Sequence, residues 1–356
     1  MLLPILALLM VGPQAETEHI AFPSGFVILW RTHALSGPSH PGVERAFILV
    51  HGAGRNAEDY YRWALASTAA ASEMGKTVVI APHFKSRAGG DAVEVGELEW
   101  GGGGWTSGEY AVVGRTTSYD VMDQVLEILN STELFPDLKE VVVAGHSAGG
   151  QFVQRYAAVN RMEPRMHIPV RYVAANPSSY FYLNELRMQL GATCPEKGQC
   201  TGKFVKYWDG SNCTTYNQYR YGMEKRTGYA AGTSEENILA LFPRRNVTYI
   251  VGALDTRTNR PQSGPVVPGH CAGAQSQRTW ADFLQLHENA VQCGSQPGDC
   301  SRLRPFRGVR LCGSGRCAGR VRKVISAVSL APVGQALGHR VPHRDVAGVL
   351  VAVVLF

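Results

Sequence analysis

The stretch EVVVAGHSAGG, Glu140–Gly150, decides the fold that this sequence predicts. Its β-branched run Val141–Ala144 is typical of a buried strand, and Ser147 follows at the centre of the pattern G-x-S-x-G. The residues after it place apolar side chains three and four positions apart, which indicates a helix. A sharp strand-to-helix turn strains its central residue and tolerates only small neighbours, here Gly145 and Gly149. We therefore expect Ser147 to stand exposed at a helix N-terminus.

Length and charge exclude some classes of protein. At 356 residues, with 45% hydrophobic and 18% charged residues, the chain has ordinary globular composition and can bury a large core. The net charge is +6, but it is unevenly distributed. From Ser301 onward there are nine Arg and one Lys and a single acidic residue, Asp345, so the tail carries +9 and residues 1–300 carry −3. A nucleic-acid-binding face needs basic residues spread over folded surface, so this distribution argues against nucleic acid as a partner.

Both the N-terminus and the cysteines indicate a protein exported from the cell. Residues 1–15 contain the apolar block LLPILALLMV, which predicts a signal peptide and is too short for a stable membrane span; a buried N-terminal strand is the alternative. All eight cysteines lie at or beyond Cys194, and none has C-x-x-C spacing, which favours disulfides over a zinc site. Three sequons are compatible with a secretory route, at Asn130, Asn212 and Asn246. We expect a secreted protein.

Strand and helix patterns alternate along the chain. Strands are expected at GFVILW (25–30), AFILVHG (46–52), TVVIAPHF (77–84), RYVAANPSS (171–179) and NVTYIVGALD (246–255). Helices are expected after Asn56, which we expect to cap the first of them, and from Ser118 to Thr132. Two segments break this rhythm. The glycine-rich segment 85–114 is either a mobile active-site loop or a linker, and the Tyr-rich segment 180–243 is expected to be an inserted lid. The lid aromatics either contact an apolar substrate group or simply pack the lid: Tyr207, Trp208, Tyr216, Tyr219 and Tyr221.

Four motifs carry a resemblance to a known family: HGAGRNA (51–57), GHSAGGQFVQRYA (145–157), AANPSSYFYLN (174–184) and GALD (252–255). Together they resemble the α/β-hydrolase superfamily and, more narrowly, a group of secreted serine hydrolases, over roughly residues 25 to 290. The resemblance implies an α/β-hydrolase fold: an α/β protein whose mostly parallel central sheet has helices on both faces and an inserted lid. The hydrolase domain is then expected over 25–292, with the lid at about 180–243.

The resemblance also implies roles for individual residues. In this fold the catalytic residues occur in the order Ser, acid, His, with the acid at the end of a late strand, so Ser147 is the expected nucleophile and Asp255 the expected acid. The N–H of Ala148 is an expected oxyanion donor. A strand ending in His-Gly supplies further donors in such hydrolases, and we assign them to Ala53 and Gly54, where small residues let a carbonyl group approach the backbone.

The catalytic histidine is the missing part of the pattern. The family places it on a loop resembling VPGVGHD after the final strand, and that stretch is absent. Residues 293–356 form instead a basic tail rich in Cys, Arg and Gly, a composition shift that suggests a gene-model artefact. Within GHRVPHRD we assign His343 as the base, with His339 second, against the alternative of two surface histidines. The closing apolar run 346–356 is expected to be a buried strand rather than an anchor signal.

Two functions follow. The first is a secreted serine hydrolase that cleaves a small-molecule carboxylic ester through an acyl-enzyme on Ser147, a reaction for which neither a metal nor another cofactor is expected. The second is a catalytically inactive hydrolase fold used for binding, or a misassembled chain, because the histidine loop is missing. His51 and His146 adjoin the motifs, and we expect both to be structural.

Overall fold

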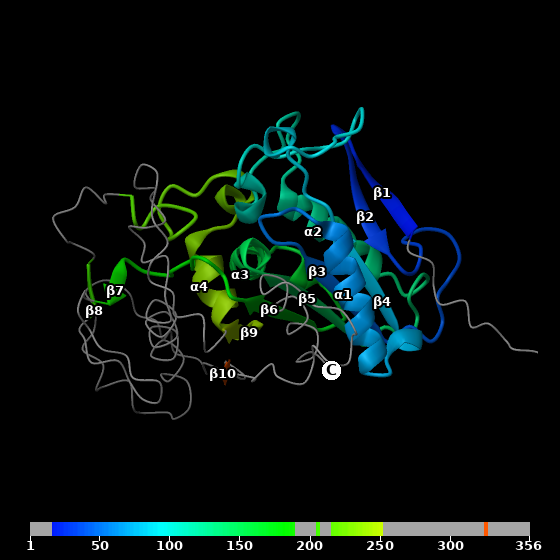
Figure 1. The fold of residues 1–356 in the computed structure, drawn as a ribbon. Helices are drawn as coiled ribbons and strands as arrows, with labels where there is room; N and C mark the ends of the chain where they lie inside the picture. Colours follow the sequence, from blue (N-terminus) through cyan, green and yellow to red (C-terminus); the bar gives the residue numbers. More distant parts are fainter. Residues whose placement is uncertain (1–15, 189–203, 207–214, 252–323, 327–356) are drawn as a thin grey trace, which may run out of the picture.

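The fold is built on one eight-stranded sheet. The computed structural model describes residues 16–188, 204–206, 215–251 and 324–326 (Figure 1). The strand order is β1-β2-β4-β3-β5-β6-β9-β10; β1 pairs with β2 and β2 with β4 antiparallel, and every other pair is parallel. The strands are β1 (Glu16–Phe22), β2 (Gly25–Arg31), β3 (Arg45–Val50), β4 (Thr77–Pro82), β5 (Glu140–His146), β6 (Val170–Ala175), β9 (Asn246–Val251) and β10 (Val324–Ser326).

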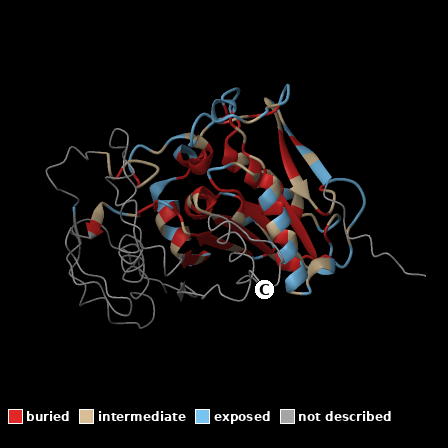
Figure 2. Cartoon of the chain, in the orientation of Figure 1, coloured by how far each residue is buried: buried red, intermediate tan, exposed pale blue. Residues whose placement is uncertain are grey.

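Helices cover both faces of this sheet, as Figure 1 shows, and Figure 2 shows the strands buried between them. Side chains alternate between the faces of a strand. In β3, Phe47 and Leu49 therefore join the core under α1, whereas Ile48 and Val50 join the larger core under α2 and α3. The helices are α1 (Ala57–Ala70), α2 (Ser118–Leu129), α3 (Ala148–Val159) and α4 (Glu235–Leu241). The predicted fold class, a mostly parallel sheet with helices on both faces, is confirmed.

The helix starts follow local side-chain chemistry in one case and depart from it in another. At α2, the Thr117 hydroxyl accepts the Asp120 N–H while the Asp120 carboxylate accepts the Thr117 N–H, a reciprocal capping box. Asn56 occupies the cap position of α1, but its side chain makes no capping bond and donates instead to the Asp59 carboxylate at 2.7 Å. The Asn56 cap predicted from sequence is therefore wrong in its chemistry, although the helix begins where expected.

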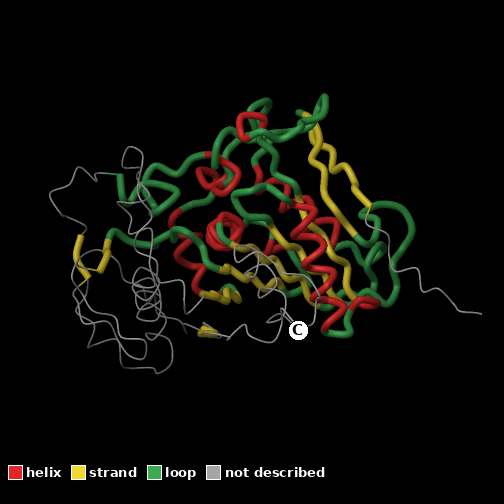
Figure 3. Tube along the Cα trace, in the orientation of Figure 1, coloured by secondary structure: helices red, strands yellow, loops and turns green. Residues whose placement is uncertain are grey.

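The glycine-rich segment 85–114 is anchored to the core by two tryptophans. Trp100 and Trp105 are fully buried and belong to the larger core, and the Trp100 indole N–H donates to the Glu109 carbonyl oxygen at 3.0 Å. Short 3-10 turns η2 (Arg87–Gly89) and η3 (Gly104–Ser107) carry the chain between these anchors. Two indole rings bury enough apolar surface to fix a segment that its glycines alone would leave loose. Figure 3 shows it as loop lying over one end of the sheet.

Two pieces of secondary structure were not expected from the sequence. Strand β1 was missed because only Ile20 of its seven residues is buried, so it lacks the apolar alternation of a half-buried strand. Between β6 and β9 lie β7 (Leu186–Met188) and β8 (Phe204–Lys206), an antiparallel pair, followed by α4. They fall in the expected lid segment, whose function as a lid remains a prediction. The short 3-10 turns are η1 (Met74–Lys76), η4 (Glu163–Arg165), η5 (Gly228–Gly232) and η6 (Phe242–Arg244).

Several sequence predictions fall on residues outside the described ranges. These are the signal peptide 1–15, all eight cysteines, Asn212, Tyr207, Trp208, Asp255, His339 and His343, and most of the tail 293–356. Only β10 of that tail is described, as a parallel neighbour of β9. Those assignments therefore stay predictions.

Candidate active site

Ser147 stands at a strained turn between β5 and α3. Its backbone has φ 58° and ψ −115°, a region that side-chain-bearing residues rarely adopt. The turn is held from both sides, because the Ser147 N–H donates to the Ala175 carbonyl oxygen at 2.9 Å and the Gln151 N–H donates to the Ser147 carbonyl oxygen at 3.0 Å. The Ser147 side chain is half-buried, and its hydroxyl has no hydrogen-bond partner among the described residues. This geometry is that of a nucleophile elbow.

Three glycines make the elbow possible, because backbone passes where a side chain would stand. A Cβ at Gly145 would lie 2.3 Å from the Gly149 carbonyl oxygen, and one at Gly149 would lie 2.3 Å from the Val50 carbonyl oxygen and 2.6 Å from that of His51. A Cβ at Gly150 would lie 2.5 Å from the Ala175 carbonyl oxygen. The first turn of α3 is thus wedged between the ends of β3 and β6. Both G-x-S-x-G glycines are sterically required.

The loop after β3 begins against this elbow and leaves backbone donors unused. Ala53 and Gly54 are exposed, and neither N–H donates a hydrogen bond within the part of the chain that the structure describes. The Ala148 N–H, at the first position of α3, is also free of any described acceptor, as expected for the first turn of a helix. The three N–H groups assigned as oxyanion donors are therefore all available to donate hydrogen bonds to a ligand oxygen.

His51 fixes the start of that loop and does not titrate in the physiological range. The Phe84 N–H donates to His51 Nε2 at 3.0 Å, so Nε2 is unprotonated and Nδ1–H donates to the Gly52 carbonyl oxygen at 2.9 Å. Complete burial lowers the pKa of His51 to about 3, against a smaller opposing effect of the Gly52 carbonyl. The Trp105 ring packs 4.6 Å from the imidazole. His51 therefore has the structural role expected for it.

The carboxyl ends of β5, β6 and β9 meet at one edge of the sheet. Gly145 pairs with Ala174 and Ala175 with Ile250, so the elbow, the end of β6 and the end of β9 lie side by side. The hydrogen bonding between β6 and β9 extends one residue beyond β6, because the Asn176 N–H donates to the Ile250 carbonyl oxygen at 2.8 Å. Asp255 follows β9 by four residues in the sequence, outside the described ranges. In the sheet, β9 lies two strands away from β5, the strand that leads to Ser147.

A buried arginine on the elbow helix joins the segments around Ser147. Arg155 is 1% exposed, and its guanidinium donates to the Thr106 carbonyl oxygen and hydroxyl, the Gln151 amide oxygen, the Ser179 hydroxyl and the Arg220 carbonyl oxygen. These acceptors come from η3, from α3, from the loop after β6 and from residues 215–251. Burial lowers the pKa of Arg155. No described carboxylate pairs with it, so a web of neutral acceptors holds its charge.

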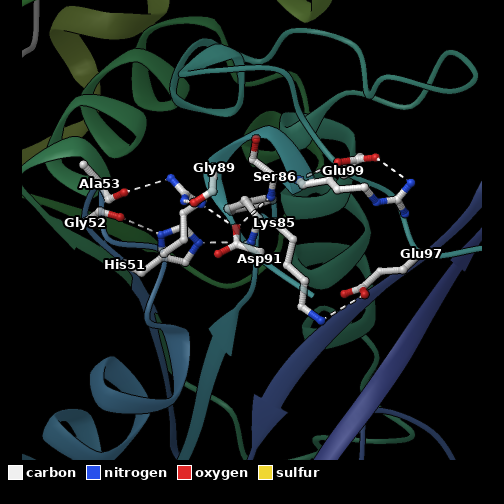
Figure 4. A network of polar contacts seen from close by, with 12 residues as sticks. His51, Gly52, Ala53, Lys85, Ser86, Gly89, Asp91, Glu97 and Glu99 are labelled. Carbon is white, nitrogen blue, oxygen red and sulfur yellow. Dashed lines mark hydrogen bonds and ion pairs between the residues drawn. The ribbon is translucent and has the colours of Figure 1, made fainter. Parts of the chain in front are cut away.

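An ion pair beside the loop was not found from the sequence. Arg55, with φ 54°, donates through Nε to the Asp91 carboxylate at 2.5 Å, and its other nitrogens donate to the Ala53 carbonyl oxygen at 3.1 Å and the Gly89 carbonyl oxygen at 2.6 Å. Figure 4 shows Ala53, Gly89 and Asp91 converging around one guanidinium group. Because Asp91 is 36 positions away in an irregular segment, no local pattern links the two residues.

Solved structures to which the chain trace is similar include hydrolases. A poly(aspartic acid) hydrolase-1 from Sphingomonas sp. KT-1 aligns at 19% identity and TM-score 0.45, covering 79% of this chain and 88% of that one. The siderophore hydrolases EstB and EstA from Aspergillus nidulans align at 14% and 10% identity with TM-scores 0.39 and 0.40, covering 79% of this chain and 84% and 83% of theirs. No protein-family model matches the chain, and no curated protein sequence matches it.

The sheet order and the elbow together define the α/β-hydrolase fold, and the predicted fold is confirmed on that basis. Within the described ranges, no three His, Cys, Asp or Glu side chains are grouped so as to hold a metal ion. None of the helices in those ranges has the length and apolar character needed to cross a bilayer.

Proposed function

We propose that this protein is a serine hydrolase that cleaves carboxylic esters through an acyl-enzyme on Ser147. The observation that carries the proposal is the strained elbow with three unused N–H groups around it. A half-buried hydroxyl without a described hydrogen-bond partner, held at a helix N-terminus beside backbone donors that lack acceptors, suits attack on a carbonyl carbon and stabilisation of the oxyanion that forms.

The reaction would run in two halves. The Ser147 oxygen attacks the ester carbonyl while its proton passes to a histidine base, for which His343 is the assigned residue and Asp255 the orienting acid. The N–H groups of Ala148, Ala53 and Gly54 would donate hydrogen bonds to the developing oxyanion. The leaving alcohol would then take the proton from the imidazolium. Water then attacks the acyl-serine by the same path, releasing the carboxylic acid and the free hydroxyl. The proposed place of action is outside the cell, following the export signals of the sequence.

A fluorophosphonate probe tests the nucleophile directly. The folded full-length protein is expected to label at one residue, and Ser147→Ala should reduce labelling and hydrolysis of an aryl ester by at least about 10³-fold. Ser36→Ala, an exposed serine in the β2–β3 connection, is the matched control and should label as the wild type does. Equal labelling of the wild type and Ser147→Ala would refute the proposal.

The absent histidine loop supports a second candidate, a hydrolase fold that binds its ligand without turnover. Loss of the general base costs on the order of 10³-fold or more in rate and leaves the fold intact. A folded wild type without probe labelling, and with ester hydrolysis equal to that of Ser147→Ala, would favour this candidate. Sequencing the transcript across residues 290–310 would decide whether a VPGVGHD-like loop exists in the natural product.

A further inference from the structure

The orientation of the loop after β3 follows from what holds its carbonyl groups. In a trans peptide the C=O and the following N–H point in opposite directions. The Gly52 carbonyl oxygen accepts from His51 Nδ1–H and from the Arg55 N–H at 3.1 Å, so the Ala53 N–H is turned to the other side. The Ala53 carbonyl oxygen accepts from the Arg55 guanidinium, which turns the Gly54 N–H likewise. Arg55 therefore acts on both peptide planes that carry the candidate oxyanion donors.

Arg55 is itself held from outside the loop. Its left-handed backbone, with φ 54°, ends the turn and directs the side chain back over Ala53. The Asp91 carboxylate, which binds Arg55 Nε, also accepts the Ser86 N–H at 2.8 Å, so the carboxylate is tied to the segment after β4. Although partial burial favours the neutral acid, the hydrogen bonds and charge of Arg55 and the Ser86 N–H outweigh it and hold the pKa of Asp91 below its ordinary value.

The segment that carries Asp91 is in turn anchored by further polar contacts, seen together in Figure 4. Lys85 pairs with Glu97 at 2.9 Å, and the Glu97 side chain is fully buried. The Arg87 N–H donates to the Glu99 carboxylate at 2.6 Å. Gly89 leaves room for the guanidinium, since a Cβ there would lie 2.3 Å from an Arg55 terminal nitrogen. The Arg55 guanidinium, which we call a clamp because it contacts Asp91, Gly89 and Ala53, is thus held against an anchored segment with little free space around it.

We propose that Arg55 is a positioning residue for catalysis, which fixes the direction of the Ala53 and Gly54 N–H groups through its clamp on Asp91 and Gly89. Arg55 does not touch the reacting atoms; it acts through the two peptide planes. The proposal deepens the proposed function and rests on it for its kinetic consequence, whereas the structural consequence, a fixed loop, stands without turnover.

Two variants release the clamp in different ways. Arg55→Gln removes the charge and the fork of donors, and Gly89→Ala keeps Arg55 but puts a methyl group where its guanidinium lies. The matched controls are Arg62→Gln, which breaks an exposed pair with Glu58 on α1, and Gly75→Ala, where an added Cβ meets nothing within 4 Å. Because a guanidinium is the flexible end of a side chain, Gly89→Ala should shift it without unfolding the protein.

The kinetic readout separates positioning from packing. Both release variants are expected to lower kcat for an aryl ester about 10- to 100-fold with KM changed less than about threefold, because the donors act on the transition state. Arg55→Lys should recover only part of the loss, since an ammonium group cannot contact Asp91, Ala53 and Gly89 with a planar fork. Both controls should retain wild-type kcat. Wild-type kcat in Arg55→Gln and Gly89→Ala would overturn the proposal.

Hydrogen exchange gives a readout that needs no turnover. The amide of residue 55 donates to the Gly52 carbonyl oxygen across the turn. Its exchange should become about tenfold faster in both release variants, because the turn opens more often without its clamp. Faster exchange in a protein whose wild type never labels would uphold the clamp and refute the proposed function. Unchanged exchange in both variants would refute the clamp, whatever the labelling shows.

Discussion

The elbow and the loop after β3 lie against each other, yet different forces hold them. The elbow is fixed by sterics between backbone atoms: Gly145 and Gly149 contact each other four residues apart, and Gly149 contacts the end of β3. The loop is fixed by side chains, His51 from within and the Arg55–Asp91 pair from outside. Backbone atoms buried in a sheet cannot yield, whereas side chains can. The elbow should therefore respond to substitution by unfolding, and the loop by losing its orientation.

Gly149→Ala should have the largest effect on this comparison. Its Cβ would lie 2.3 and 2.6 Å from two backbone carbonyl oxygens of β3 and the following His51, so α3 must separate from the sheet. We expect a loss of at least about 3 kcal/mol in the free energy of unfolding, measured by chemical denaturation. Gly75→Ala is the control of equal chemistry. A Gly149→Ala protein as stable as this control would show that the elbow is not held by sterics.

The loop should behave in the opposite manner. Arg55→Gln should cost only about 1 kcal/mol of unfolding free energy, because its partners lie near the surface and stay accessible to water. The same variant should lose one to two orders of magnitude in kcat, because the Ala53 and Gly54 N–H groups lose their fixed direction. A large loss of unfolding free energy with kcat unchanged would show that the loop, like the elbow, responds to substitution by unfolding, and would contradict the difference proposed between them.

A further effect, on stability as a function of pH, concerns the packing between α2 and the elbow helix α3. Asp123 on α2 accepts the hydroxyls of Tyr156, at 2.7 Å, and Tyr229, at 2.6 Å, and Arg161 lies over the Tyr229 ring. Burial raises the pKa of Asp123 from 3.8 to about 6, against the opposing effect of the two hydroxyls. The folded state then binds the proton more tightly, so stability should fall as pH rises from about 4 to 6 and stay level above.

Asp123→Asn should remove that slope. The difference between the two proteins, from urea unfolding at pH 4 and pH 7, should be at most about 3 kcal/mol, the equivalent of two pKa units. Probe labelling of Ser147 at a fixed pH should be unchanged, because Asp123 acts on the stability of the helix packing and not on the elbow's geometry. Identical pH profiles for both proteins would show that Asp123 carries no such proton.

The sequence predicted what short-range rules determine. The strand β5, the elbow at Ser147 and the helix α3 follow from apolar periodicity and from glycines two residues on either side of the serine. The central sheet followed from repeated alternation of strand and helix. Strand β1 lacked that signal, since an edge strand keeps most of its side chains in water. The burial of Trp100 and Trp105 in the larger core was not predictable, because sequence alone does not show which indole rings pack into a core.

The site was predictable only in part for the same reason. Ala53 and Gly54 could be assigned as donors from the sequence because small residues after a strand are typical of a close approach of backbone to ligand. The side chains that orient them were not, since Arg55 and Asp91 are 36 residues apart and both types are common on surfaces. Arg155 was hidden within an apolar helical pattern, where a charge usually indicates a solvent-facing position. Contacts between irregular segments leave no periodic pattern in the sequence, so they cannot be predicted from it.

The backbone of Ser147 has a consequence for evolution and engineering. A residue held at φ 58° and ψ −115° raises the energy of the native state by about 1–3 kcal/mol, and glycine adopts this conformation without the penalty. Ser147→Gly should therefore be more heat-resistant than the parent, less the entropy that glycine adds to the unfolded chain. A selection for thermostability alone would favour loss of the hydroxyl, and only selection for turnover would retain serine at this position.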